Sequence, residues 1–344
     1  MAVKISGGEL FNELLEHSKK ISKRIVFSDG DDIRLAEALD FFQDVNDSSF
    51  ILLGNEQKIL SNIKQAGIKN TDRFTIINPA KSPKLEDYKS IIRDSFKARN
   101  KDISDEKLNK NVLNTSYWTS VMLKTDEADC AIGGSISTTA DLVRGVINVL
   151  GLVPGKKFLS GAAFVDVPDC SYGINGKFCV ADPAIIPKPG EDQLLDMALS
   201  SYDTAKSVFE DEPRVAMLSY STRGSADGEE IEKIRNVVDR IRKMRPEVII
   251  DGEIQFDAAI VPEVFAIKAP NSVLEGKANV LIFPELNAAN IGYKIIQRLG
   301  KAEVCGTVVQ GAAKPFNDLS RGCLVQDIIS LTAMTLLQAK GMQQ

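Results

Sequence analysis

The sequence of 344 residues contains a single histidine, His17. This scarcity excludes a Ser-His-Asp triad of the usual kind, an H-E-x-x-H metal site and a histidine general base in the body of the chain. A general base must therefore be an aspartate, glutamate, lysine, tyrosine or cysteine. We interpret His17 itself as a solvent-exposed residue of an amphipathic first helix.

The five cysteines are odd in number, scattered, and never arranged as C-x-x-C. This pattern favours reduced thiols in a cytoplasmic protein over a disulfide framework or a zinc site. The N-terminal stretch has no apolar core of signal-peptide length, and no later run is long enough to span a bilayer. The net charge of -5 argues against a nucleic acid or a membrane surface as the main partner, but it leaves small anionic ligands open.

Two nucleotide-binding signatures are also absent, since no G-x-x-x-x-G-K-[ST] occurs and no G-x-G-x-x-G follows a predicted strand. What the chain does contain is an alternation of short apolar runs and helical patterns. "RIVFSDGDD" predicts a strand and turn before the helix "IRLAEALDFF", and "SFILLG", "FTIINP" and "DCAIGG" each precede another helix. This repetition predicts an α/β fold with mostly parallel sheets and helices on both faces.

The length favours two domains. In the middle of the chain, "KKFLSGAAFVDVPD" and "GKFCVADPAII" flank a turn at Gly173 and Gly176. Two strands joined so closely predict an antiparallel hairpin. This hairpin is either an antiparallel insertion or the opening of a second domain, and we place the domain boundary near Pro154.

Ligands of open parallel sheets bind beyond the carboxyl ends of the strands. One such loop is "GGSISTTADLVRG", where Gly133 and Gly134 permit close approach of the backbone, Ser137 and Thr138 supply hydroxyls, and Arg144 follows within about two turns. Thr138 and Asp141 also have the form of a capping box. The loop is therefore either an anion-binding helix start or an ordinary cap beside a surface arginine. "SYSTRGSADG" is a second polar turn of this kind.

For two further stretches, a functional and a structural interpretation fit the sequence equally well. "DGEIQFDAA" brings Asp251, Glu253 and Asp257 together, which suits either metal or acid–base chemistry or a strand end followed by a helix start. "FPELNAANIGYK" places Asn287, Asn290 and Tyr293 at helical spacing, where they bind a ligand or cap a helix.

The stretch "KPFNDLSRGCLVQDI" carries the sharpest prediction. If a helix begins near Ser320, Asp327 lies two turns later on nearly the same face. Ser320 and Arg321 would then lie at the positive helix end, with a carboxylate beside them. Such a set can bind an anion and deprotonate an acid, although a serine at a helix start is common for structural reasons alone.

At this point the chain resembles the phosphate acetyltransferases of the phosphate acetyl/butyryl transferase family. The strings that carry the resemblance run in the family's order from about residue 130: "TTADLVR", "ADPAIIP", "PRVAMLSYSTRGSA", "IDGEIQFDAAIVP", "GKANVLIFPELNAANIGYKI" and "QGAAKPFNDLSRGC". The resemblance implies two α/β domains like those of isocitrate and isopropylmalate dehydrogenases, with the active site in the cleft between them. It also implies a homodimer. The C-terminal segment would return to the first domain, so that residues 1–153 and about 309–344 form that domain and 154–308 form the second.

The activity implied is the reversible reaction of acetyl-CoA with phosphate to give acetyl phosphate and CoA. The family places a Ser-Arg pair and an Asp at its centre, which here are Ser320, Arg321 and Asp327, and an arginine that matches Arg144. Another family arginine lies in an R-K-x-K-G string, but this chain reads "FKARNKDIS", so that Arg99 is the nearest candidate and Arg93 another. Together with these arginines, we assign Ser137 and Thr138 as residues that bind phosphate or acetyl phosphate. As candidate CoA contacts we assign Ser221, Thr222, Asn287, Asn290 and Tyr293.

The expected mechanism needs neither metal nor bound cofactor, because CoA is itself a substrate. Asp327 accepts the thiol proton of CoA, and the thiolate attacks acetyl phosphate directly in a ternary complex. Ser320 binds the developing oxyanion or the departing phosphate, and Arg321 and Arg144 bind the phosphate. Cys323 is the rival nucleophile, but we interpret it as a packing residue.

Three other functions compete with this one. A phosphate butyryltransferase or broader acyl transferase would share every motif above. A dehydrogenase with the same fold is disfavoured by the missing dinucleotide fingerprint. A non-catalytic acetyl-CoA-sensing domain is disfavoured because Ser320, Arg321 and Asp327 are all present.

Overall fold

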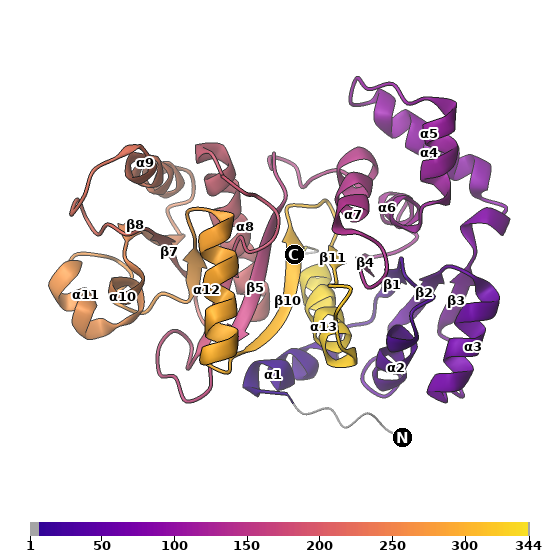
Figure 1. Ribbon diagram of the computed structural model, residues 1–344, viewed down its shortest axis with the longest axis horizontal. Helices are drawn as coiled ribbons and strands as arrows, with labels where there is room; N and C mark the ends of the chain where they lie inside the picture. Colours follow the sequence, from indigo (N-terminus) through magenta and orange to yellow (C-terminus); the bar gives the residue numbers. More distant parts are fainter. Residues whose placement is uncertain (1–6, 343–344) are drawn as a thin grey trace. The chain divides into compact units, whose positions relative to one another are not determined.

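The computed structural model describes residues 7–342 and contains two sheets in two compact units, each covered by helices (Figure 1). The first unit comprises Glu13–Pro154 and the chain from Ala312 on, and the second comprises Gly7–Asn12 and Gly155–Gly311. The predicted α/β class with mostly parallel sheets is confirmed.

The first unit holds a five-stranded, fully parallel sheet in the order β11-β4-β1-β2-β3. Its helices α2, α3 and α13 cover one face and α4 to α7 the other (Figure 1). Its strands are β1 (Arg24–Phe27), β2 (Ser49–Leu53), β3 (Phe74–Ile77), β4 (Cys130–Gly133) and β11 (Phe316–Asp318). Its helices are α2 (Ile33–Phe42), α3 (Glu56–Ala66), η1 (Pro79–Lys81), α4 (Leu85–Lys97), α5 (Asp105–Leu113), α6 (Thr115–Lys124), α7 (Thr139–Gly145), the π-helical η2 (Val146–Leu150) and α13 (Val325–Gly341). Helix α1 (Glu9–Ser18) precedes them.

The second unit holds a six-stranded sheet in the order β10-β5-β6-β9-β7-β8. β5 pairs antiparallel with both β6 and β10, and the remaining pairs are parallel, which confirms the predicted hairpin. Its strands are β5 (Ser160–Asp166), β6 (Lys177–Ala181), β7 (Arg214–Leu218), β8 (Ile249–Ile254), β9 (Val280–Ile282) and β10 (Glu303–Gln310). Its helices are α8 (Glu191–Val208), α9 (Glu229–Met244), α10 (Phe256–Ile260), α11 (Pro262–Lys268) and α12 (Leu286–Leu299).

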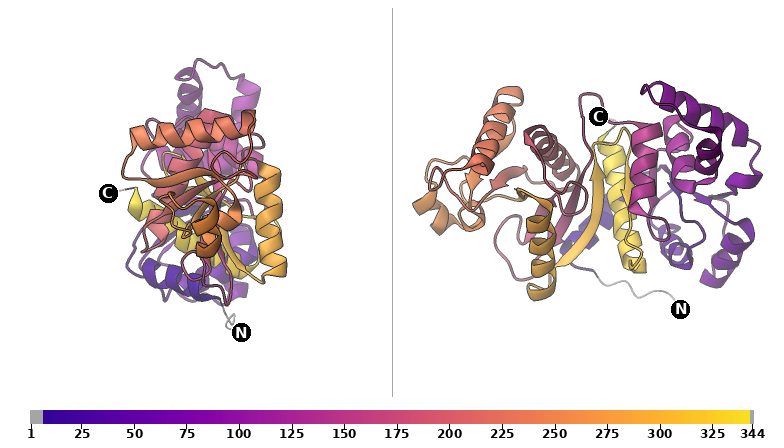
Figure 2. Two further views of the ribbon diagram at one scale, coloured as in Figure 1. Left: turned by 90° about the vertical axis from the view of Figure 1, so that its left-hand side faces the viewer. Right: turned by 45° about the horizontal axis from the view of Figure 1, so that its top comes forward.

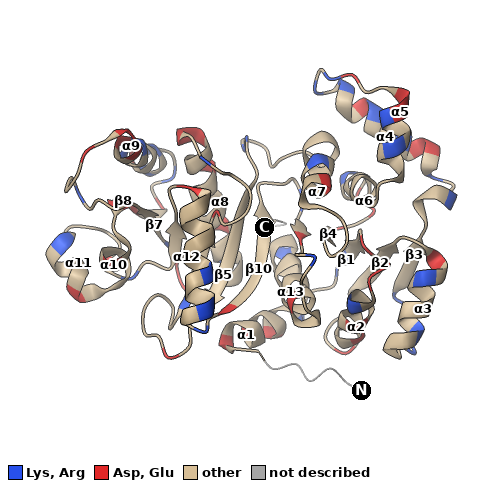
Figure 3. Ribbon diagram, viewed as in Figure 1, with Lys and Arg blue, Asp and Glu red and all other residues tan. Residues whose placement is uncertain are grey.

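Local chemistry explains where the helices begin. A side-chain oxygen at each N-cap accepts a backbone N–H of the first turn, which satisfies a group that the helix itself leaves unpaired. The residues that do so include Asp32, Asn55, Ser104, Asn114 and Thr138. Charged residues of both signs lie mainly on the helices and loops, while the strands are mostly uncharged (Figure 3).

The C-terminal helix α13 packs against α2, β4 and β11 of the first unit, so the end of the chain lies beside elements from its first 150 residues (Figures 1 and 2). The helix is buried from Ile328 to Ala339. Strand β11 is hydrogen-bonded to this helix: the Asn317 amide donates to Thr335 Oγ1 at 2.8 Å and to Gln338 Oε1 at 2.6 Å.

Two sequence predictions about boundaries are wrong. Helix α13 begins at Val325 and not near Ser320, because residues 319–324 form an open loop after β11. In this loop the carbonyls of Arg321 and Cys323 accept from the Arg34 side chain instead of from helical N–H groups. The segment Gly7–Asn12 lies with the second unit and not the first. The reason is that the Gly8 and Leu10 N–H groups donate to the carboxylates of Glu303 and Asp166 at 2.6 and 2.9 Å.

Candidate active site

Three loops meet at the carboxyl edge of the first unit's sheet. β11, β4 and β1 are parallel neighbours, so the loops that follow them emerge side by side. These loops are residues 28–32 after β1, 134–138 after β4 and 319–324 after β11. They lead into α2, α7 and α13 respectively. This edge carries the residues that sequence reasoning placed at the centre of the chemistry.

Asp29 fixes the loop after β4. Its buried carboxylate accepts the N–H groups of Gly134 at 2.7 Å and Ile136 at 3.2 Å, and both the N–H and the hydroxyl of Ser137. A carboxylate that accepts several N–H groups holds a loop in one conformation. The Ser137 hydroxyl is thus occupied by Asp29 in this structure. The sequence stretch "SDGDD" predicts a turn and a loop at the carboxyl end of a strand, but it assigns no role to Asp29 itself.

The loops after β4 and β11 approach each other closely at Gly134. Its φ is +93°, and a Cβ there would lie 2.0 Å from Asp318 Oδ1 and 2.4 Å from the Leu319 carbonyl. Only glycine therefore fits this position. The Leu319 N–H donates to the Gly133 carbonyl at 2.7 Å, and the Thr139 hydroxyl donates to Asp318 Oδ2.

Asp318 is a half-buried acid beside this contact that the sequence analysis missed. Burial, with a smaller contribution from the charge of Asp29, raises its pKa to about 6 against the opposing effect of the Thr139 hydrogen bond. Its Oδ1 has no hydrogen-bond partner among residues 7–342. The pKa of Asp318 is thus about 6, and the residue lies two positions before Ser320.

Replacing Asp318 with asparagine should change how stability depends on pH. Between the ordinary pKa of an aspartate and about 6, the folded chain holds the Asp318 proton more tightly than the unfolded chain, so wild-type stability falls as the pH rises through this range. The asparagine of the variant would not titrate, and Thr139 could still donate to it. At about 1.4 kcal/mol per pKa unit, the variant should gain about 3 kcal/mol over wild type between pH 3.5 and 7.

Denaturant unfolding at a series of pH values measures this gain. Asp129→Asn is the control, because the pKa of Asp129 is shifted in the opposite direction. Burial raises this pKa, but hydrogen bonds from Arg24 outweigh burial and leave it below its usual range. The stability from Asp129 is present above its unfolded pKa and is lost as the pH falls. Parallel pH profiles for wild type and Asp318→Asn would contradict the prediction.

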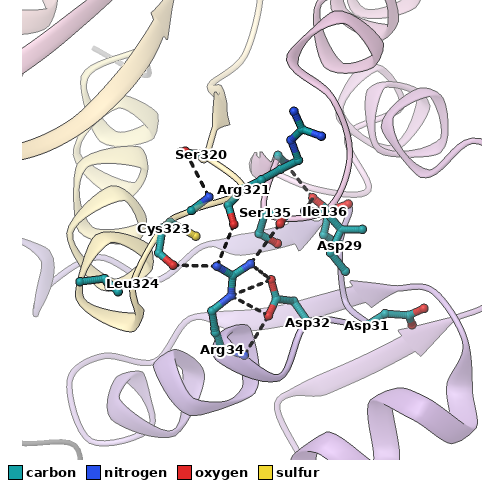
Figure 4. Close-up of polar contacts among 12 residues, drawn as sticks. Asp29, Asp31, Asp32, Arg34, Ser135, Ile136, Ser320, Arg321, Cys323 and Leu324 are labelled. Atoms are coloured by element: carbon teal, nitrogen blue, oxygen red, sulfur yellow. Dashed lines mark hydrogen bonds and ion pairs between the residues drawn. The ribbon is translucent and has the colours of Figure 1, made fainter.

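The loop after β11 presents its functional groups outward. Cys323 N–H donates to the Ser320 carbonyl at 2.9 Å, which closes a turn over Ser320–Cys323. Ser320 and Arg321 are exposed, and the Arg321 side chain points away from the turn (Figure 4). Asp327 lies in the first turn of α13, half-buried, and its Oδ2 accepts the Leu324 N–H at 2.8 Å.

Asp327 therefore marks where α13 begins, since its carboxylate satisfies an N–H that the helix would leave unpaired. The predicted geometry, with Ser320 and Asp327 two turns apart on one helix, is replaced by a turn followed by a helix start. The chemical set of a hydroxyl, a guanidinium and a carboxylate remains on one short segment.

The remaining phosphate candidates lie around α4 and α7. Thr138 caps α7 by accepting the Asp141 N–H at 3.3 Å, which confirms the predicted cap. Arg144 is exposed and pairs with Asp141 at 3.0 Å. Arg99 Nε donates to the Asn148 carbonyl in η2 at 3.3 Å, and its charge adds to burial in lowering the pKa of Lys124. Arg93 pairs with Asp105 at 2.8 Å.

The candidate CoA contacts all lie in the second unit. Ser221 and Thr222 are buried, and their hydroxyls bond internally to Glu253 Oε1 at 3.1 Å and Gln255 Oε1 at 3.2 Å. Both hydroxyls therefore stabilise the loop that contains them. On α12 the three candidates differ in exposure: Asn287 is exposed, Asn290 donates to the Pro183 carbonyl at 2.9 Å, and Tyr293 packs against an apolar core.

The carboxylates of "DGEIQFDAA" have separate cationic partners, which supports their structural interpretation. Asp251 pairs with Arg242 at 2.7 Å, and Asp257 pairs with Lys268 at 2.8 Å. Burial raises the pKa of Glu253, but hydrogen bonds from Arg235 and the Gly224 N–H outweigh burial and lower it to about 2. Residues 7–342 contain no group of three His, Cys, Asp or Glu side chains that could hold a metal ion. In the same range, no helix is long and apolar enough to cross a bilayer.

Cys323 is buried, and burial raises its pKa, so that the thiolate is scarce at neutral pH. Cys323→Ala should therefore keep kcat within about threefold of wild type, because the thiolate and not the thiol is the nucleophile. Steady-state turnover measures this, and intact-mass analysis after acetyl phosphate should show no acetyl adduct on the wild type. An essential acyl-cysteine would abolish turnover of the variant.

A hydroxyl, a guanidinium and a carboxylate at the carboxyl edge of a parallel sheet are groups with which an α/β enzyme can bind an anion and accept a proton. The comparisons with known proteins agree with this class. A family model described as phosphate acetyl/butaryl transferase matches residues 9–336. Phosphate acetyltransferases from Clostridium acetobutylicum and Bacillus subtilis are 40% and 36% identical over 333 and 336 residues, which cover 96% of this chain and 99% of each relative.

A crystal structure of a phosphotransacetylase from Streptococcus pyogenes is 34% identical and superimposes with a TM-score of 0.89, covering 98% of this chain and 99% of that one. The chain therefore belongs to the phosphate acetyl/butaryl transferase family. The resemblance stated from sequence motifs is confirmed.

Proposed function

We propose that this chain is a phosphate acetyltransferase that transfers an acetyl group reversibly between CoA and phosphate. The observation that carries the proposal is the segment Ser320–Asp327, which joins an exposed hydroxyl, an exposed guanidinium and a half-buried carboxylate. The chain that contains it is similar to phosphate acetyltransferases over almost its full length. CoA is a substrate of this reaction, and the proposed chemistry uses side chains of the protein alone.

Asp327 accepts the proton of the CoA thiol. A free thiol of pKa about 8.5 is mostly protonated at neutral pH, so a nearby base raises the concentration of the nucleophile. The thiolate forms the C–S bond with the acetyl carbon of acetyl phosphate, the C–O bond to phosphate breaks, and phosphate leaves. The Ser320 hydroxyl donates to the developing oxyanion or to the departing phosphate oxygen.

Arg321 and Arg144 bind the phosphate through charge-assisted hydrogen bonds. We place Arg99, Ser137 and Thr138 nearby as further phosphate contacts. For CoA we retain Asn287, Asn290 and Tyr293, which lie on α12. Since the hydroxyls of Ser221 and Thr222 are bonded internally, they would contact CoA only after their loop rearranged.

We further propose a homodimer, as the family resemblance implies, and a cytoplasmic location. The cysteines support the location, because within residues 7–342 none of them forms a disulfide, as is usual in a reducing compartment. These residues are Cys130, Cys170, Cys179, Cys305 and Cys323.

CoA-dependent arsenolysis tests the activity. With a catalytic amount of CoA, acetyl phosphate should be consumed completely only when the chain, arsenate and CoA are all present. Acetyl arsenate hydrolyses and CoA is regenerated, whereas without arsenate the consumption stops once the CoA is acetylated. The family description covers butaryl as well as acetyl transfer, whereas the similar relatives named above are phosphate acetyltransferases. We therefore expect kcat/KM to be higher for acetyl phosphate than for butyryl phosphate. Absence of arsenolysis would refute the function, and a reversed ratio would favour the butyryl enzyme.

A further inference from the structure

Arg34 joins all three loops of the candidate active site, although the sequence shows it only as the second residue of helix α2. Figure 4 shows its guanidinium between the loops after β4 and β11. Nη1 donates to the carbonyls of Arg321 at 3.0 Å and Cys323 at 2.7 Å, and Nη2 donates to the Ser135 carbonyl at 3.1 Å.

Asp32 sets the direction of this guanidinium. Nε and Nη2 of Arg34 donate to the Asp32 carboxylate at 2.7–3.2 Å, and Asp32 is at the same time the N-cap of α2. The Asp32 side chain is only 5% exposed, and a charge so deeply buried is costly without a partner. Arg34 supplies that partner. Every nitrogen of the planar guanidinium therefore has a partner, which leaves little freedom in its position.

The turn that carries Ser320 and Arg321 depends on these contacts. It has no helical or sheet ladder of its own, and two of its carbonyls accept from a single charged group. Charge-assisted hydrogen bonds are about twice as strong as neutral ones. Without Arg34 these carbonyls would turn toward water, and the side chains of Ser320 and Arg321 would move with the main chain that bears them.

We propose that Arg34 is a positioning residue for acetyl transfer, which holds the Ser320–Cys323 turn against the Ser135 loop so that Ser320 and Arg321 face the reacting phosphate. The inference rests on the proposed function. Arg34 touches no substrate, and its effect on the rate acts through the main chain of Arg321 and Cys323.

Arg34→Lys tests the proposal, since a lysine keeps the charge but cannot donate in five directions. A displacement of about 1 Å in a reacting group costs on the order of 10²-fold in rate, so kcat should fall by about that factor. Arg73→Lys is the matched control. The Arg73 guanidinium also donates to main-chain carbonyls, including Gln43 at 2.7 Å and Ser48 at 3.3 Å. Arg73 directly precedes β3, at the opposite edge of the same sheet.

Arg73→Lys should lower the melting temperature at least as much as Arg34→Lys while its kcat stays near wild type. A second variant, Arg34→Ala, removes the side chain and leaves room for a free guanidinium ion. Guanidinium chloride below denaturing concentrations should restore part of its kcat, whereas urea at the same concentration should not.

Wild-type kcat in Arg34→Lys, or an equal loss in Arg73→Lys, would overturn the proposal. Failure of both Arg34 variants to fold would also overturn it, because the residue would then stabilise the unit instead of positioning a loop. An inactive wild type would refute the proposed function and this inference together, whereas an active wild type with an unaffected Arg34→Lys would refute the inference alone.

Discussion

Asp327→Asn should lower kcat by about 10²–10⁴-fold, the usual contribution of a positioned general base. The histidine-poor composition leaves Asp327 as the titratable group proposed to accept the CoA proton, and asparagine cannot accept it. The asparagine Oδ1 can still accept the Leu324 N–H, so the start of α13 should remain intact. The loss therefore reports chemistry instead of unfolding. Initial rates of thioester formation from CoA and acetyl phosphate measure it, and CoA binding should change little.

Asp87→Asn is the matched control for this substitution. Asp87 is the third residue of α4, as Asp327 is the third residue of α13, and both helices belong to the first unit. Its variant should turn over at the wild-type rate. If Asp327→Asn also kept wild-type turnover, Asp327 would not be the base, and the proton would have to pass to another group or to water.

Arg321→Gln should lower kcat/KM for acetyl phosphate by about 10–150-fold. A charge-assisted hydrogen bond contributes about 1.5–3 kcal/mol, and a tenfold change corresponds to about 1.4 kcal/mol. The main-chain carbonyl of Arg321 would still accept from Arg34, so the turn itself should persist. Arg321→Lys should recover only part of the loss, since an ammonium group lacks the bidentate geometry that fits a phosphate.

The control for Arg321 is Arg24→Gln, at the amino end of β1. Arg24 is exposed and pairs with Asp129 at 2.7 Å, on the edge of the same sheet opposite the three loops. Its variant should lose some stability and no phosphate affinity. Steady-state kinetics with acetyl phosphate varied at saturating CoA would separate the two. Equal kcat/KM for Arg321→Gln and wild type would remove Arg321 from the phosphate site.

Much of the fold follows from hydrophobic periodicity. The strands around Val26, Ile51 and Ile132 are short apolar runs, each followed by a helix, and the sequence predicts their parallel pairing. The short strand β11 was missed because Phe316–Asp318 is only three residues long and carries an asparagine and an aspartate, which are rare in strands. Its place beside β4 is set by a partner 185 residues earlier in the chain, which no local pattern encodes.

The residues of the candidate site could be predicted from the sequence, but their spatial arrangement could not. Ser320, Arg321 and Asp327 stand out as a polar set in one stretch, but the helix start between them is fixed by the carboxylate of Asp327 itself. Asp29 and Arg34 act on loops more than 100 and more than 280 residues away. Their only signal was a run of charged residues after a predicted strand, which is also typical of an ordinary turn and cap.

Exchange of labelled phosphate into acetyl phosphate tests the central claim most directly. If the acetyl group passes straight to the CoA thiolate in a ternary complex, the chain should incorporate labelled phosphate into acetyl phosphate when CoA is present and should incorporate none when CoA is absent. Incorporation without CoA would reveal an acetyl-enzyme intermediate and contradict direct transfer, and no incorporation with CoA would contradict the proposed reaction itself.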